Sequence, residues 1–438
     1  MIACPSGLLR AQSGKKSVAV FEENRVWQGN EGGKVMYHVY GLTATRKGVV
    51  LAFSEARYDH TDEGPHDLLC KRSTDGGKTW SESIVIEKGD GSFWRANGQP
   101  DKRECWANPA ALADQKTGRV LFFYVLNEGQ YRGKNTQRMT RVFYKTSDDD
   151  GQTWSERIEI TDLLNAKADG SPNRDAQGKP VLNEDGFPCD YLGRAFHMPG
   201  PGHGIQLKNG RLLLQFWHRK AIGRFKPDGS YESVPSAERN YSDSVIYSDD
   251  QGKTWKKGGS TGLGQFVTES RLVELADGRV MLNGRIDAPK PPAGPDQPDL
   301  KNHPSKHRWV AISTDQGLTW QNEHIDQTLP PFTNVDCGFI RYRTGRKSAK
   351  AALLLSHPSE LNARAGMTIS ASFDEGRTWP IHKPVFDGGT QYSDLVTLPD
   401  GSVGLLYGRA HKQPGQTSYG FRVDEVVFVR FNDAWLHQ

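Results

Sequence analysis

Several features that mark common protein classes are missing from this chain. It has no run of 18 apolar residues, and its first twenty residues lack an apolar stretch, so neither a membrane span nor a signal peptide is expected within it. The net charge is only +4, and no block of Lys or Arg marks a nucleic-acid-binding arm. The five cysteines form no Cys-x-x-Cys pair, which argues against a zinc or redox motif.

Helical periodicity is also missing, and this absence points to the fold class. The chain has 47 Gly and 24 Pro, a content that favours many turns over long helices. Short apolar runs bounded by turn residues occur throughout, as expected for strands; examples are VVLAFSE, RVLFFYVL, RLLLQFW, AALLLSH and SVGLLYG. The sequence therefore predicts an all-β protein.

What is present is one pattern, Ser-x-Asp-x-Gly-x-Thr-Trp, which we call the Asp box. It occurs five times, at Ser73–Trp80, Ser147–Trp154, Ser248–Trp255, Ser313–Trp320 and Ser372–Trp379. Asp and Gly at fixed offsets suit a tight hairpin, because Asp bonds nearby backbone N–H groups and Gly adopts positive φ. The Trp ring is expected to pack against a neighbouring strand. We interpret the boxes as structural hairpins and not as sites of chemistry.

The repeats predict a specific architecture. Five boxed units, with a sixth unit closed between the two chain ends, indicate a six-bladed β-propeller of four-stranded antiparallel sheets. We expect a single domain over residues 1–438, with residues 1–15 as a flexible lead-in. The insertions 163–190 and 287–306 are rich in Gly, Pro and Asp and are predicted to be long loops.

Segments outside the boxes give the chain a resemblance to a known family. It resembles the sialidase (neuraminidase) superfamily, in particular the bacterial and animal exo-sialidases. The matching stretches occur in family order over nearly the whole chain, and they are LAFSEARYDHTD, NPAALADQKTGRVLFFY, GPGHGIQLKNGRLLL, TESRLVELADGRVMLNGR, LLLSHPS and YSDLVTLPDGSVGLLY.

The resemblance implies a particular glycosidase chemistry. A sialic acid carries a carboxylate on its anomeric carbon, which would repel a carboxylate nucleophile. Sialidases use a neutral Tyr activated by a Glu instead. An Asp then serves as general acid and later as general base, and three Arg hold the substrate carboxylate.

Carried over position by position, the resemblance assigns roles to residues of this chain. Tyr392 corresponds to the nucleophile and Glu269 to its base partner. Asp62 corresponds to the acid/base residue, although Asp59 and Asp67 lie in the same polar loop and stay open as alternatives.

Three arginines also correspond to family positions. Arg57 matches an arginine near the distal hydroxyls of the substrate, and Arg285 and Arg364 match the second and third arginines that hold the carboxylate. His203 also lies in a matching stretch, where a turn or packing role is the expected one.

The sequence departs from the family at the first of the three arginines. His38 occupies the arginine position and Tyr40 the position of a following proline, while Gly408 occurs where the family usually has Glu. Histidine is mostly neutral near pH 7 and offers one donor at a time. Loss of one charged partner would weaken carboxylate binding by about 1.5–3 kcal/mol. His38 and Tyr40 are therefore expected to contact and reshape the substrate site.

These observations predict an exo-acting, retaining glycoside hydrolase that releases a terminal acidic sugar, most simply sialic acid or a related nonulosonic acid. One alternative is a glycosidase or polysaccharide lyase on the same scaffold that uses His38 and Tyr40 on a uronic-acid-type sugar. Another is a non-catalytic carbohydrate-binding protein. A glycan substrate, no cofactor, no metal, no nucleic-acid partner and a secreted or periplasmic location are expected.

Overall fold

The computed structural model describes residues 18–128, 130–289, 300–342, 351–412 and 422–438. These residues form β-strands with a few helical turns, so the all-β prediction is confirmed. The expected lead-in, residues 1–15, lies outside the described residues, and the single domain over 1–438 stays a prediction.

The largest sheet has nine strands, in the order β11-β10-β7-β6-β4-β3-β2, with β5 on β4 and β13 on β6. Strands β2, β3 and β4 form one antiparallel group and β6, β7, β10 and β11 another, and the parallel pairing of His66 in β4 with Cys105 in β6 joins the two groups. The strands are β2 (Met36–Ala44), β3 (Val50–Arg57), β4 (His66–Ser73), β5 (Ile84–Glu87), β6 (Cys105–Ala113), β7 (Val120–Asn127), β10 (Thr140–Ser147), β11 (Ile158–Glu159) and β13 (Gly202–His203).

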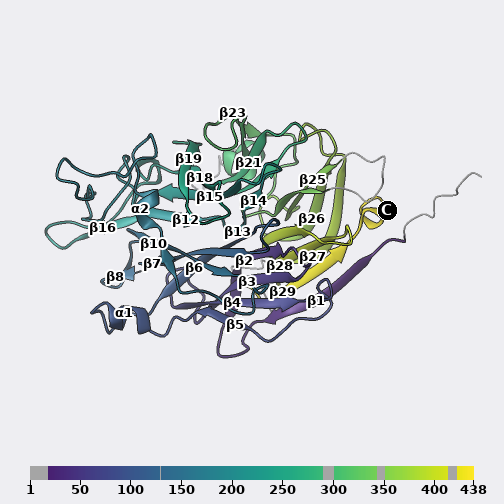
Figure 1. Cartoon of the computed structure of the whole chain (residues 1–438), viewed down its shortest axis with the longest axis horizontal. Coiled ribbons are helices and arrows are strands. Elements are labelled where there is room, and N and C mark those ends of the chain that lie inside the picture. Colours follow the sequence, from purple (N-terminus) through teal and green to yellow (C-terminus); the bar gives the residue numbers. More distant parts are fainter. Residues whose placement is uncertain (1–17, 129, 290–299, 343–350, 413–421) are drawn as a thin grey trace, which may run out of the picture.

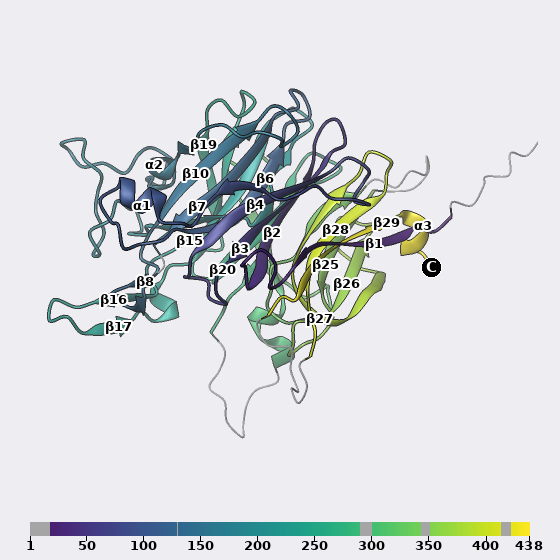
Figure 2. The same ribbon diagram turned by 90° about the horizontal axis from the view of Figure 1, so that it is seen from below.

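A seven-stranded sheet joins the two ends of the chain, in the order β1-β29-β28-β27-β26-β25-β24. The pairing of β1 with β29, from Phe21↔Phe431 to Gln28↔Glu425, agrees with the expected unit shared between the ends. The two strands lie side by side in purple and yellow in Figures 1 and 2. The strands are β1 (Phe21–Gln28), β24 (Phe339–Tyr342), β25 (Ala352–Pro358), β26 (Ala365–Ser372), β27 (Ile381–Thr397), β28 (Val403–Ala410) and β29 (Glu425–Phe431).

Two smaller sheets and two hairpins complete the strands. A five-stranded sheet contains β12 (Phe196–Pro199), β14 (Ile205–Gln206), β15 (Leu212–Arg219), β18 (Ser242–Ser248) and β19 (Lys256–Thr261). A four-stranded sheet contains β20 (Val267–Glu274), β21 (Val280–Ile286), β22 (Arg308–Ser313) and β23 (Gln321–Asp326). The hairpins are β8 (Gln130–Tyr131) with β9 (Lys134–Asn135), and β16 (Gly223–Phe225) with β17 (Tyr231–Ser233), which protrudes from the body in Figure 2.

The predicted closed propeller of six separate four-stranded sheets is therefore wrong. The described strands form sheets of nine, seven, five and four strands with two hairpins, and the large sheets curl around a common interior. The physical reason is backbone pairing that continues across the expected boundaries. His66 N donates to Glu104 O, and the single 17-residue strand β27 pairs with both β26 and β28. Repeat spacing in the sequence does not report such pairing.

The Asp boxes form closed hairpin turns. In the first box, Ser73 Oγ donates to Asp75 Oδ1 at 2.7 Å, and the same carboxylate accepts from Thr79 N at 3.0 Å and from Thr79 Oγ1 at 2.6 Å. The other four boxes repeat these bonds. The carboxylate of each Asp-box aspartate accepts hydrogen bonds from its own turn, in line with a structural role for the boxes.

The first predicted loop contains a repeat that our sequence analysis missed. Residues 165–188 are three successive eight-residue units, NAKADGSP, NRDAQGKP and VLNEDGFP, each with a Gly at positive φ and a closing Pro. Bridges Ala166↔Pro172, Arg174↔Pro180 and Leu182↔Pro188 close the units. Backbone bonds from Asn173 N to Asn165 O and from Val181 N to Asn173 O stack them. The segment is thus an ordered stack rather than a long loop.

The helices are short and peripheral. They are α1 (Ser92–Ala96), α2 (Thr161–Leu164) and α3 (Asp433–Leu436), with 3-10 turns η1 (Ser236–Glu238), η2 (Leu300–Asn302) and η3 (Pro304–Lys306). None of the helices in the described ranges has the length and apolar character needed to cross a membrane.

Burial separates inner strands from outer strands. Strands β3, β6, β7, β25 and β28 are buried along their whole length, and all of them except β6 contain an apolar run noted in the sequence. By contrast, β23 exposes four of its six residues. Strands buried on both faces have continuous apolar runs because neither side chain direction meets water. The inner strands therefore provide the rigid frame for the site.

Candidate active site

A pocket of about 290 Å³ is lined by residues of all four large sheets. Four strands change their pairing register where they reach this pocket. The shifts lie between His38 and Tyr40 in β2, Ala107 and Ala110 in β6, Val267 and Ser270 in β20, and Thr390 and Ser393 in β27. Pocket residues Val39, Asn108, Glu269 and Tyr392 lie inside these four bulges. Because a bulge re-aims side chains, the bulges turn residues from ordinary strands toward one cavity.

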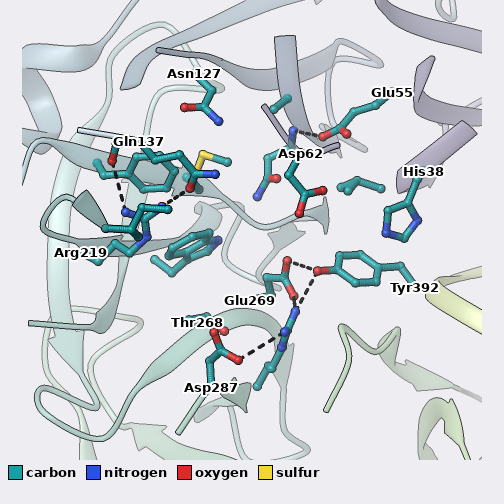
Figure 3. Close-up of a pocket in the computed structure, with 18 of the residues that line it drawn as sticks. His38, Glu55, Asp62, Asn127, Gln137, Arg219, Thr268, Glu269, Asp287 and Tyr392 are labelled. Atoms are coloured by element: carbon teal, nitrogen blue, oxygen red, sulfur yellow. Dashed lines mark hydrogen bonds and ion pairs between the residues drawn. The ribbon is translucent and has the colours of Figure 1, made fainter. Parts of the chain in front are cut away.

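The predicted nucleophile and its base partner are in direct contact. Tyr392 Oη donates to Glu269 Oε1 at 2.5 Å, and Figure 3 shows the two side chains facing each other. Arg285 Nη1 lies 2.6 Å from Glu269 Oε2 and 2.8 Å from Tyr392 Oη. Burial, together with the Glu269 charge, raises the pKa of Tyr392 well above its usual value. The phenol is therefore protonated until Glu269 accepts its proton.

Arg364 lies near the ring of the same tyrosine. Its guanidinium carbon is 5.6 Å from the ring centroid of Tyr392, and its Nη1 donates to Gln391 Oε1 at 2.9 Å. Burial, with the neighbouring Arg285 charge, lowers the pKa of Arg364 from its usual value. Arg285, in β21, and Arg364, directly before β26, thus bring two guanidinium groups close to the same tyrosine.

His38 lines the pocket and packs edge-on against Tyr392, with ring centroids 4.7 Å apart. Figure 3 shows it on the same side of the pocket as the tyrosine ring. Burial, followed by the charges of Arg57 and Arg364, holds the pKa of His38 well below its usual value. A buried imidazole among arginines is neutral near pH 7, so His38 does not replace the charge of an arginine.

Tyr40 does not line the pocket. Val39 has a φ of 63°, and this bulge turns Tyr40 away, so that its hydroxyl donates to Tyr37 O at 3.0 Å. A Cβ at position 408 would clash with that hydroxyl. The two departures from the family pattern, Tyr40 and Gly408, are therefore coupled, because the tyrosine fills the space that a side chain at 408 would need.

Arg57 connects the predicted acid/base residue to a second carboxylate. Its Nη1 lies 2.6 Å from Asp62 Oδ1, and its Nη2 lies 2.6 Å from Glu55 Oε2. Arg57 is buried, whereas the Asp62 side chain is 61% exposed. The surrounding pocket walls partly desolvate the Asp62 carboxylate, which by itself would raise its pKa, but the charge and hydrogen bond of Arg57 outweigh this effect and lower the pKa. Asp62 is therefore ionised in the free protein.

The two open alternatives to Asp62 lie elsewhere. Asp59 Oδ1 accepts from Thr61 N at 2.8 Å within its own turn. Asp67 is buried, pairs with Lys34 and accepts from Gly89 N at 2.8 Å. Neither lines the pocket, so of these three aspartates only Asp62 faces it.

Glu55 is a pocket residue that sequence analysis missed. It accepts from Asn108 N at 2.9 Å as well as from Arg57, and it is 1% exposed. Burial raises its pKa to about 7 in spite of the Arg57 charge. The available signal was spacing: Glu55 is two residues before Arg57 in the same strand, and such residues share a face.

A buried ionic network lies next to the predicted catalytic pair. Arg271, two residues after Glu269, lies 2.6 Å from Asp336 and 3.4 Å from Asp394, which is two residues after Tyr392. Asp394 also pairs with His203 at 2.7 Å and accepts from Leu42 N at 2.9 Å. The network ties β2, β20 and β27 together, and it gives His203 the packing role expected of it.

The wall opposite Tyr392 contains residues with no earlier assignment. It is formed by β12, β15 and the segment before β18, and its members are Phe196, Met198, Trp217, Arg219, Arg239 and Tyr241. Figure 3 shows Arg219 and Gln137 on the left, across the pocket from His38 and Tyr392. No motif marked these residues, because they come together only through sheet packing.

No set of metal ligands is gathered in the described ranges, where His, Cys, Asp and Glu form no group of three or more that could hold an ion. Cys70, Cys105, Cys189 and Cys337 are free and buried, and Cys4 lies outside the described residues.

Comparisons with known proteins place these features in a family. Residues 48–405 match the family model of the BNR repeat-like domain. A sialidase of Micromonospora viridifaciens is 32% identical over 411 residues, covering 91% of this chain and 52% of the relative. A sialidase of Bacteroides fragilis is 27% identical over 388 residues, covering 85% of this chain and 59% of the relative. The chain thus spans somewhat more than half the length of these relatives.

A solved structure has a similar fold. A Hadza microbial sialidase aligns with a TM-score of 0.67 at 24% identity, covering 92% of this chain and 66% of that one. The family match over most of the chain and the sequence relatives agree with the resemblance seen in the sequence motifs. The chain belongs to the BNR repeat-like domain family and to the sialidase superfamily.

Proposed function

We propose that this protein is an exo-acting, retaining glycosidase that releases a terminal sialic acid or a related nonulosonic acid from a glycan or glycoconjugate. One observation carries the proposal: the 2.5 Å hydrogen bond between Tyr392 and Glu269 in a pocket that also contains Asp62, Arg285 and Arg364. The names of the sialidase relatives support it.

In the proposed reaction, Arg285 and Arg364 bind the substrate carboxylate by charge-assisted hydrogen bonds. Tyr392 Oη attacks the anomeric carbon while its proton passes to Glu269, and Asp62 donates a proton to the glycosidic oxygen as the C–O bond breaks. Water then attacks the glycosyl–tyrosine intermediate. Asp62 takes the proton of the water, and Tyr392 leaves with the proton returned by Glu269. Two displacements at one carbon retain the anomeric configuration.

The protonation states place one requirement on substrate binding. Asp62 is ionised beside Arg57 in the free protein, yet it must hold a proton to act first as an acid. An anionic substrate that excludes water from the pocket would raise the pKa of Asp62 by desolvation and like-charge repulsion. The negative charge of the substrate therefore helps to prepare its own acid catalyst.

The size of the pocket supports exo action. At about 290 Å³ it lies near the lower end of small-molecule sites, which suits one terminal sugar better than an internal segment of a polymer. Glycoconjugates are displayed mainly outside the cytoplasm, so a secreted or periplasmic location is part of the proposal.

The alternative with His38 and Tyr40 as catalytic groups gains no support from the geometry. The Tyr40 hydroxyl is bonded to Tyr37 O outside the pocket, and the pKa of His38 is held well below the range of a general acid at neutral pH. The third possibility, sugar binding without turnover, is separated from hydrolysis by the same experiment that tests the proposal.

That experiment is the hydrolysis of an aryl α-sialoside by the wild type and by Tyr392→Phe. Removing the nucleophilic oxygen is expected to lower kcat by about a thousandfold or more, since nucleophile and base act as a unit. Tyr247→Phe, outside the pocket, is the matched control. Full activity in Tyr392→Phe, or a wild type that binds the sialoside without cleaving it, would contradict the proposal.

A further inference from the structure

The wall opposite Tyr392 contains an arginine whose charge no carboxylate in the described chain neutralises. Arg219 is 3% exposed and lines the pocket, and it forms no ion pair within 4.0 Å among the described residues. Its guanidinium donates only to neutral acceptors: Nη1 to Gln137 O at 3.2 Å and to Lys220 O at 2.9 Å, and Nη2 to Gln137 Oε1. The charge is held in place but not balanced by contact.

Among the described residues, the carboxylates nearest to this wall do not contact Arg219 directly. Glu63 accepts from Gln137 Nε2 at 2.8 Å, so the neutral amide separates it from Arg219. The charge of Asp287 attracts Arg219 only at longer range. The Asp287 carboxylate oxygen lies 2.8 Å from Asn334 Nδ2 and 3.5 Å from Arg285 Nη2. Both carboxylates thus have closer partners than Arg219.

The neighbours of Arg219 add further donors. Arg239 donates to Val234 O at 2.9 Å and to Tyr241 Oη at 3.3 Å, again to neutral oxygens. The buried indole N–H of Trp217 has no hydrogen-bond partner in the described part of the chain. Arg219 itself lies over the ring of Phe196, with 3.6 Å from its guanidinium carbon to the ring centroid. The wall thus has two arginines bonded to neutral oxygens and one N–H group without a described acceptor.

A buried guanidinium without a carboxylate partner is unfavourable unless a ligand supplies the charge. Burial and the adjacent Arg239 charge lower the pKa of Arg219 to about 10, whereas the carboxylate partners of Arg57 raise the pKa of that buried arginine. Sugar hydroxyls would accept hydrogen bonds here, but they would not neutralise the charge. An oxyanion does both.

We propose that Arg219 and Arg239 form a second anion subsite, which binds an oxyanion substituent of the substrate, a sulfate or phosphate ester or a carboxylate, across the pocket from the groups that hold the anomeric carboxylate. The inference rests on the proposed function for the identity of the substrate. The binding of an anion by Arg219 and Arg239 is argued independently, from their own contacts. It identifies the preferred substrate as a doubly anionic glycoside.

The test compares three aryl α-sialosides: one without a sulfate, one with a sulfate ester on the tail of the terminal sugar, and one with a sulfate on the aryl leaving group. The wild type is expected to hydrolyse one of the sulfated compounds with kcat/KM about 10–100-fold above the unsulfated one, the range for a charge-assisted hydrogen bond. Which compound is preferred tells whether the anion belongs to the released sugar or to the leaving group.

Variants attribute that preference to the wall. Arg219→Gln is expected to abolish the sulfate preference, Arg219→Lys to keep part of it, and Arg239→Gln to reduce it. Arg141→Gln, which removes an equally positive charge paired with Glu159 outside the pocket, is the control and should leave the ratio unchanged. If Arg219→Gln does not fold, Arg219→Lys and Arg239→Gln still decide the question.

Equal kcat/KM for all three compounds in the wild type, or an undiminished preference in the Arg219 variants, would overturn the inference. A separate measurement keeps it independent of turnover: calorimetric binding of the free tail-sulfated and unsulfated sugars to wild type and to Arg219→Lys. Sulfate- and Arg219-dependent binding without hydrolysis would refute the proposed function and retain the subsite. Hydrolysis without any sulfate effect would support the proposed function and refute the subsite.

Discussion

The two walls of the pocket hold their charges in different ways. On one wall, Glu269 and Tyr392 are bound to Arg285, and the buried network of Arg271 and Asp394 lies behind them. On the other wall, the hydrogen bonds of Arg219 and Arg239 within the described part of the chain go to neutral oxygens in every case. On the first wall the Tyr392–Glu269 pair is already joined to Arg285 without a ligand, whereas the second wall lacks negative charge.

This difference indicates a division of labour. A wall whose groups are fixed by mutual ion pairs is preorganised, as proton transfer and nucleophilic attack require. A wall with an uncompensated charge gains most when a ligand supplies the missing partner, and so it is suited to selecting substrates. Three substitutions test how far the first wall depends on its own charge balance.

The largest effect is expected from Asp394→Asn. This carboxylate is fully buried and is bound to His203, Arg271 and the N–H of Leu42, so its neutralisation leaves Arg271 undercompensated. Breaking a buried pair costs about 3–5 kcal/mol of unfolding free energy. Denaturant unfolding measures the loss, and kcat on an aryl α-sialoside should fall as well because β20 and β27 lose a common anchor.

Asp287→Asn is the matched control for that measurement. Asp287 also lies in the pocket and contacts Arg285, but its side chain is 44% exposed, so its loss should cost about 1 kcal/mol or less. If Asp394→Asn were no more destabilising than Asp287→Asn, the buried network would not be what supports the first wall.

His38→Arg adds charge to the first wall and should have an intermediate effect. His38 is neutral and lies beside Tyr392, so a guanidinium there would add a third charged donor for the substrate carboxylate. We expect KM for an aryl α-sialoside to fall by about tenfold, in keeping with one charge-assisted hydrogen bond. Steady-state kinetics beside His38→Gln, which adds no charge, measure the effect. A KM equal in both variants would show that the position does not meet the carboxylate.

The smallest effect concerns pH and Glu55. Its pKa is about 7 when folded against 4.5 as its ordinary value, so the folded protein binds the proton more tightly. The stabilisation from this group is therefore complete below about pH 4.5 and is lost as the pH rises through about 7. We expect a loss of about 1–2 kcal/mol over this range.

Unfolding free energies of wild type and Glu55→Gln at pH 4.5, 6 and 7.5 measure this contribution. Groups common to both proteins cancel, so the difference between them should shrink steadily over that range. A difference that stays constant with pH would mean that Glu55 does not titrate there and is held ionised by Arg57 throughout.

Local patterns allowed the hairpins and the main site residues to be predicted. The Asp boxes form the expected turns because each contains all donors and acceptors of its own hydrogen bonds. Tyr392, Glu269, Asp62, Arg285 and Arg364 line one pocket as the motifs predicted, and their roles stay proposals. Tyr40 was placed wrongly in the pocket because the bulge at Val39 is not visible in the sequence.

Two predictions about architecture were wrong for different reasons. Treating the boxes as separate units gave six four-stranded sheets, whereas pairing across His66 and Cys105 and along β27 joins strands into larger sheets. Treating residues 163–190 as a loop overlooked three stacked octapeptides. In the first case the missing information was which backbone groups pair with each other, whereas in the second the eight-residue period was present in the sequence and only the stacking of the units required the structure.

The sequence by itself determined the all-β class, the five closed turns and the residue types available for chemistry, because periodicity, turn preference and side-chain chemistry are local properties. Only the tertiary structure decided the sheet boundaries, the four bulges that aim Glu269, Tyr392, Asn108 and Val39 into one pocket, and the unbalanced charge of Arg219. These features depend on pairing register and on the burial of groups far apart in the chain, and both are fixed only when the strands pack.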